Sequence, residues 1–134
     1  MKKILFTISA ILLFTVVKAQ TKYAFAYAYN SIDKVIYISD AINCDSYKDC
    51  KDDNGYNSTI SPDKCIEREY LKVVKISAGQ KYSHFTIRVK SHKGDNNGYN
   101  APDTFNSESD AREARRNLLS KYTSDGYNYI TLGL

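Results

Sequence analysis

Residue types alternate with a period of two along four stretches of the chain. In residues 21–29, aromatic side chains occupy every second position and alanines stand between them. This period of two is typical of a β-strand, whose successive side chains point to opposite faces of a sheet. A turn at Asn30–Asp33 separates it from a second alternating stretch, 34–39, so the two predict a β-hairpin. Residues 81–90 and 127–132 predict two further strands.

Two other stretches repeat apolar residues at helical spacing. The first follows Ser61–Asp63, which offers an N-cap, a proline at the first helical position and an acid in the first turn. The Val-Val-Lys-Ile content of residues 73–76 leaves a β-hairpin as the alternative for this segment, 62–77. The second helix begins after Ser107, and Gly126 lies just beyond its end. Its apolar stripe consists of Ala111, Ala114, Leu118 and Tyr122.

These elements follow the order β-β-α-β-α-β and predict an α+β fold. They favour a two-layer sandwich in which both helices cover one face of a four-stranded, mostly antiparallel sheet. Residues 40–60 and 92–105 are expected to form long loops. The helix-facing side of the sheet is expected to carry small and aliphatic residues, namely Ala24, Ala26, Ala28, Ile36, Ile38, Phe85, Ile87, Val89, Ile130 and Leu132.

The opposite face of this predicted sheet is rich in aromatic residues. The chain has twelve tyrosines and no tryptophan. Exposed aromatic patches mark binding or assembly surfaces, and a tyrosine ring stacks while its hydroxyl forms hydrogen bonds. The alternatives are cross-strand pairs that only stabilise the sheet, or loops that bury the rings. The candidate binding residues on this face are Tyr23, Phe25, Tyr27, Tyr29, Tyr37, Tyr82, His84, Arg88, Tyr127 and Tyr129.

The N-terminus has the pattern of a cleavable secretion signal. Two lysines precede an apolar run of about fourteen residues, which is shorter than the roughly 20 that a membrane-spanning helix needs. Cleavage after Ala19 leaves a single domain of residues 20–134 that is periplasmic or secreted. Loss of Lys2, Lys3 and Lys18 lowers the net charge from +4 to +1. This near-neutral charge argues against a nucleic-acid partner, and no stable membrane span is expected after cleavage.

Three cysteines, Cys44, Cys50 and Cys65, all lie in the predicted mature part. Export to an oxidising compartment favours one disulfide and one remaining thiol, and the spacing leaves all three pairings open. A cysteine hydrolase that pairs Cys65 with His84 is a remote alternative, because no catalytic signature surrounds Cys65 and a disulfide would consume it. The Asp/Asn-rich segments 49–55 and 95–98 lack the ligand spacing of a calcium loop, so no cofactor or metal is predicted.

The last third of the chain resembles half of a SPOR-type domain. The matching residues are Phe85–Val89, the segment Ser107–Ala114 and the segment Ser124–Ile130. The resemblance implies binding to peptidoglycan glycan strands through one sheet face. The chain departs from the SPOR pattern by a long insertion before the helix, an extra N-terminal strand and the lack of a matching first half. As a whole it resembles short exported bacterial proteins of unknown function.

The sequence thus predicts an exported, non-catalytic binding module for a glycan or a protein partner in the cell envelope. The alternative is a structural or interaction protein that uses the same face to bind a protein partner or to form a homodimer.

Overall fold

The computed structural model describes residues 21–54, 58–93 and 104–134. The predicted signal, 1–19, and the segment 95–98 lie outside the described residues. The predicted α+β class is confirmed, and the sheet is mixed. The elements in chain order are β1 (Tyr23–Asn30), β2 (Val35–Ile38), β3 (Ile42–Asn43), η1 (Cys44–Tyr47), α1 (Pro62–Ala78), η2 (Gly79–His84), β4 (Thr86–Lys90), α2 (Glu108–Ser124) and β5 (Asn128–Thr131).

Strand β1 is the centre of the sheet. It pairs antiparallel with β2 on one side and with β4 on the other, and the short strand β3 adds at its first residues. Strand β5 pairs with β2 in parallel and forms an edge of the sheet. The predicted hairpin of β1 and β2 is therefore confirmed, and β3 adds a fifth strand within the segment predicted to be a loop.

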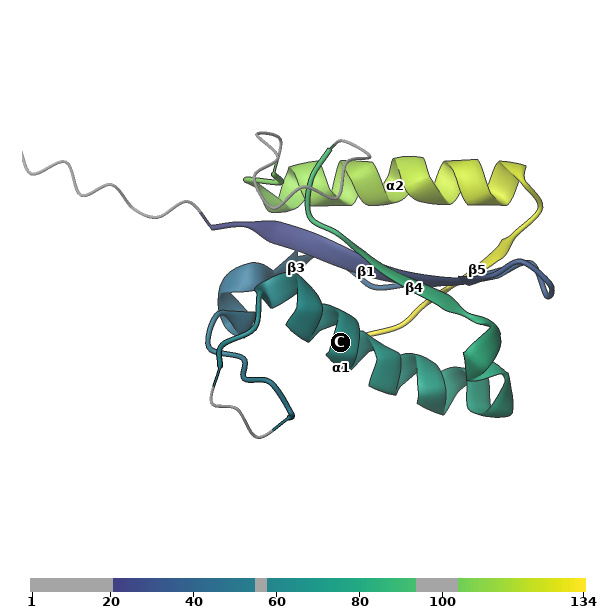
Figure 1. Ribbon diagram of the computed structural model, residues 1–134. Helices are drawn as coiled ribbons and strands as arrows, with labels where there is room; N and C mark the ends of the chain where they lie inside the picture. The colour runs from purple at the N-terminus through teal and green to yellow at the C-terminus, as the bar shows by residue number, and fades with distance from the viewer. Residues whose placement is uncertain (1–20, 55–57, 94–103) are drawn as a thin grey trace, which may run out of the picture.

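The two helices lie on opposite faces of the sheet, which corrects the expectation that both cover one face (Figure 1). Helix α1 packs on the alanine row of β1, whereas α2 packs on the face of Phe25 and Ile38. Strands β2, β4 and β5 run in the same direction, because β1 is antiparallel to β2 and β4 while β5 is parallel to β2. The crossover through α1 leads from β2 to β4, and the crossover through α2 leads back across the sheet to β5. Crossovers of the same hand that run in opposite directions must place their helices on opposite faces.

Helix α1 forms where its cap and its apolar spacing predict it. The Ser61 side chain accepts a hydrogen bond from the Lys64 backbone N–H, and Pro62 occupies the first turn. Ile66, Tyr70 and Val74 recur every fourth residue, so they share one face of the helix, and all three are fully buried. They pack on Ala24, Ala26 and Ala28, whose small side chains allow the helix to approach the sheet closely. The β-hairpin alternative for this segment is therefore wrong.

Helix α2 is also capped as predicted, since the Ser107 side chain accepts from the Asp110 N–H at 3.1 Å. Contacts with β5 and with the residue after β2 anchor the middle of the helix. The Arg115 guanidinium donates to the Ser39 carbonyl at 2.7 Å and to the Thr131 hydroxyl at 3.1 Å. One arginine thereby connects α2 to the end of β2 and to β5.

One further segment differs from the sequence-based expectation. Only residues 86–90 of the predicted strand 81–90 pair with β1, and residues 79–84 form the 3₁₀ helix η2 instead. Gly79 has φ of 57°, a conformation that L side chains rarely adopt, and it ends α1. None of the helices in the described parts of the chain has the length and apolar character needed to cross a membrane.

Candidate functional site

The aromatic row of β1 is largely covered by α2, so the expectation of an open aromatic platform is wrong. Phe25 is fully buried and its ring lies 6.2 Å from that of Phe105. Tyr23 and Tyr27 are half-buried and pack against the same cluster as Leu118 of α2. The alternation that grouped these residues is correct, but their face is the second helix-covered face of the sheet. Whether any of them contacts a ligand stays a prediction.

Three of the predicted site residues do not lie on this face. Tyr37 pairs with Ala28 in the β1–β2 register, so it faces α1 and stacks on Phe85 with ring centres 4.7 Å apart. Its neighbours Ile36 and Ile38 face α2, the reverse of the predicted assignment for β2. Tyr82 and His84 belong to η2 and lie beyond the end of β4, because the predicted strand begins only at Thr86.

Three residues of the set, Tyr27, Tyr29 and Tyr127, gather around Tyr122 in the last turns of α2. Tyr27, Tyr29, Tyr122 and Tyr127 form a group that we call the tyrosine cluster. The Tyr122 ring lies 6.3 Å from Tyr27, 5.6 Å from Tyr29 and 4.9 Å from Tyr127. The Lys34 ammonium lies 4.6 Å above the Tyr127 ring, a cation–π contact. Tyr122 was expected only as part of the α2 apolar stripe. Tyr129 is paired next to Ile36 on the same face and is 55% exposed.

The tyrosine cluster predicts a pH dependence of stability. Burial, followed by the neighbouring tyrosine hydroxyls, raises the pKa of Tyr122 to about 12. In the unfolded chain the pKa of tyrosine is about 10, so folding favours the neutral ring. The resulting stabilisation should be complete below pH 10 and should decline as the pH rises from about 10 towards 12. Urea unfolding between pH 8 and 11 should show this decline, and a Tyr122→Phe variant should show a smaller one. Equal declines in both proteins would contradict the assignment.

A groove runs between α2 and the edge strand β4. It encloses about 430 Å³, which is within the usual range for ligand sites. Its lining combines apolar side chains with amide, carboxylate and ammonium groups. We call it the α2–β4 groove. It is lined by Lys90, Lys93, Phe105, Asp110, Glu113, Ala114, Asn117, Leu118 and Lys121.

The tyrosine cluster lies next to the α2–β4 groove along α2, although none of its rings lines the groove. Arg88 pairs with Tyr27 in the β1–β4 register, so the exposed Arg88 lies on the α2 side of β4, like Lys90. On the helix, Lys121 lines the groove and Tyr122 follows it in the cluster. The polar positions at helical spacing beside the apolar stripe of α2 were the sequence signal for this site. That signal alone could not identify β4 as the opposite wall.

The cysteines form one disulfide, between Cys50 and Cys65, as predicted in number. The bond ties the segment after η1 to the first turn of α1. Because Cys65 is bonded, it has no free thiol for the nucleophilic role that the hydrolase hypothesis gave it beside His84. Cys44 is a free, buried thiol, and burial together with nearby carboxylates raises its pKa to about 12. A thiol in that state is a packing residue and a poor nucleophile at neutral pH.

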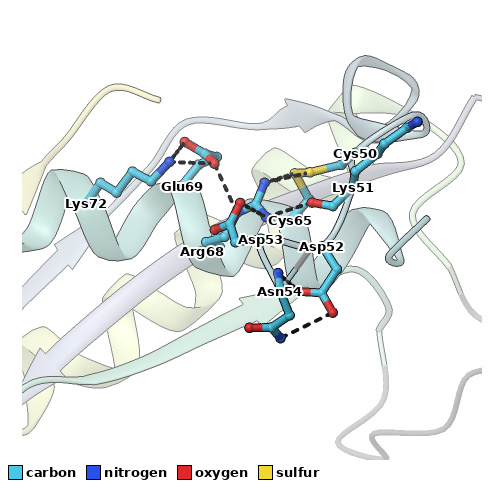
Figure 2. Close-up of polar contacts among 9 residues, drawn as sticks. All are labelled: Cys50, Lys51, Asp52, Asp53, Asn54, Cys65, Arg68, Glu69 and Lys72. Carbon is cyan, nitrogen blue, oxygen red and sulfur yellow. Dashed lines mark hydrogen bonds and ion pairs between the residues drawn. A yellow bond between two sulfur atoms is a disulfide. The ribbon is translucent and has the colours of Figure 1, made fainter. Parts of the chain in front are cut away.

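Arg68 of α1 organises the polar contacts around the disulfide (Figure 2). Its guanidinium donates to the Lys51 carbonyl at 2.8 Å and to Cys50 Sγ at 3.0 Å. It also forms ion pairs with Asp53 at 2.9 Å and with Glu69 at 3.2 Å. Within the described segments, no three cysteine, histidine or acidic side chains are placed to hold a metal ion.

Comparisons with protein-family models, with curated proteins and with solved structures gave no match for this chain. The resemblances to SPOR-type domains and to short exported bacterial proteins therefore stay predictions.

Proposed function

We propose that the protein is an exported, non-catalytic binding module that holds a glycan of the cell envelope in the α2–β4 groove. The observation that carries this proposal is the groove itself, with its mixed lining of apolar, amide and charged side chains. A disulfide is typical of proteins that fold in oxidising compartments, which supports export to the periplasm or the medium.

The composition of the groove fits a sugar chain. Leu118 and Ala114 offer apolar surface to the faces of sugar rings, while Asn117, Asp110 and Glu113 can exchange hydrogen bonds with hydroxyl and amide groups. Lysines 90, 93 and 121 together with Arg88 outnumber the two carboxylates. This excess of positive charge suits a glycan that carries carboxylate groups. The half-buried rings of the tyrosine cluster, next to the groove along α2, offer further surfaces on which sugars can stack.

The test is co-sedimentation of the mature protein with purified, insoluble cell wall. A double variant, Asn117→Ala with Lys121→Glu, removes a hydrogen-bonding group and reverses a charge on the groove wall. Loss of these two contacts should weaken binding about tenfold or more. Arg116→Glu, on the exposed surface of the same helix and outside the groove lining, is the matched control and should bind normally. Equal binding by all three proteins would refute the groove as the site.

The second candidate, self-association, is favoured by one observation at the edge strand β5. Ile130 is 48% exposed and Tyr129 lies beside it, and residues 126–134 contain no charged side chain. The opposite edge strand, β4, carries Arg88 and Lys90, which discourage pairing with another strand. Sedimentation velocity of the same preparation distinguishes the two functions. A dimer that persists on dilution, without wall binding, would replace the glycan proposal.

A further inference from the structure

The Cys50–Cys65 disulfide has a cation placed against both of its sulfur atoms. Arg68 Nη2 lies 3.0 Å from Cys50 Sγ and 3.8 Å from Cys65 Sγ (Figure 2). The side chain of Arg68 is only 25% exposed, and its other nitrogens are held by Asp53, Glu69 and the Lys51 carbonyl. The guanidinium is therefore fixed beside the disulfide rather than free to swing into solvent.

The two sulfurs differ in access and in surroundings. Cys65 is 3% exposed, whereas Cys50 is partly exposed in the segment that precedes α1. Cys65 also lies in the first turn of α1, where the helix dipole favours negative charge. In thiol–disulfide exchange, the better leaving group is the sulfur whose thiolate is more stable. Access thus favours attack on Cys50, and the N-terminus of α1 favours departure of Cys65 as a thiolate. Arg68 lies nearer to Cys50 Sγ than to Cys65 Sγ, so it does not select the leaving sulfur, but at 3.8 Å it still stabilises a thiolate on Cys65.

We propose that the Cys50–Cys65 disulfide is a site of thiol–disulfide exchange, at which an external thiol is captured on Cys50. The thiolate of a low-molecular-weight thiol forms a bond to Cys50 Sγ. The S–S bond breaks, and its electron pair goes to Cys65 Sγ, which becomes a thiolate beside Arg68. The product is a mixed disulfide on Cys50. Attack of Cys65 on Cys50 Sγ reverses the step and expels the external thiolate.

The acidic partners of Arg68 supply a second, opposite test. Asp53 is 71% exposed and its carboxylate lies 2.9 Å from the guanidinium, so it offsets part of the positive charge that the leaving thiolate would experience. Glu69 acts in the same sense but also pairs with Lys72 at 2.9 Å. Removing the Asp53 charge should therefore speed the exchange, whereas removing Arg68 should slow it.

The experiment incubates the folded, oxidised protein with reduced glutathione, quenches with acid, alkylates free thiols and maps the modified peptides by mass spectrometry. Glutathione should be found on Cys50 and the alkyl group on Cys65. Arg68→Ala should lower the exchange rate about three- to tenfold, and Asp53→Asn should raise it. Lys72→Ala, which removes a neighbouring cation that does not contact the disulfide, should leave the rate within about twofold of wild type.

Rates in concentrated urea separate the chemical effect from changes in folding. All variants should exchange at one common rate there, because the unfolded chain does not place Arg68 beside the sulfurs. Glutathione found on Cys65, or an Arg68→Ala rate equal to or above that of the wild type, would overturn the proposal. A faster rate in Arg68→Ala would show that Arg68 only clamps the segment over the disulfide. If Arg68→Ala does not fold, an unchanged rate in Asp53→Asn refutes the proposal in the same way.

Discussion

Replacing Phe25 with alanine is expected to lower the free energy of unfolding by about 3–5 kcal/mol. The Phe25 side chain is fully buried between β1 and α2, where it packs with Phe105, Ile38 and Ala111. Its removal leaves a cavity under the helix in addition to the lost transfer free energy. Because small domains are stable by only about 5–15 kcal/mol, the loss is a large share of the total. Urea unfolding followed by circular dichroism measures it.

Tyr129→Ala is the matched control. This ring lies on the same face of the sheet but on the edge strand β5, where it is 55% exposed. Its loss should cost less than about 1 kcal/mol. Similar, small losses of stability at both positions would mean that α2 does not cover the aromatic row. They would support the open aromatic platform that the sequence predicts.

The sequence predicted the elements well because each rests on local chemistry. Ser61 and Ser107 both cap helices as expected, and the apolar spacing after each one persists for the whole helix. The strict alternation of residues 23–29 identified which side chains of β1 share a face. These signals depend on neighbours within a few residues, so they can be recognised without knowledge of the tertiary fold.

Which helix covers which face of the sheet could not be predicted from local sequence in the same way. Ile36 and Ile38 were assigned to the alanine face because aliphatic residues were expected there, yet the register with β1 places them beside Tyr27 and Tyr29. That register is a long-range property. A shift of one residue moves a whole strand to the other face.

The direction of the two crossovers is also a long-range property, and it determines whether the tyrosines of β1 are covered by a helix. Once β4 and β5 lie at opposite edges of the sheet, α2 must cover the face that α1 leaves open. The aromatic row of β1 then becomes a second core. The candidate site moves to the rim of that core, where the tyrosine cluster and the α2–β4 groove meet solvent.

Removal of the disulfide is expected to have the second largest effect on stability. The double variant Cys50→Ala with Cys65→Ala frees a segment whose ends are 15 residues apart in sequence. The chain-entropy model gives a loss of about 3 kcal/mol for a loop of this length, because the unfolded chain gains freedom that the bond had denied it. Urea unfolding of the variant should therefore resemble that of the reduced wild-type protein, and added reductant should not change the variant further.

The contacts that remain decide whether this loss is global or local. Without the bond, Arg68 still pairs with Asp53, and Ile60 still donates its backbone N–H to the Cys50 carbonyl at 3.0 Å. If these contacts hold the segment closed, the rates of amide hydrogen exchange in α1 and at residues 50–52 should rise together. This is the result expected when the bond acts by lowering the entropy of the unfolded state. The contrary result would be faster amide hydrogen exchange at residues 50–52 alone, with an unchanged midpoint of urea unfolding. It would show that the disulfide only closes this segment and does not stabilise the sheet and its two helices.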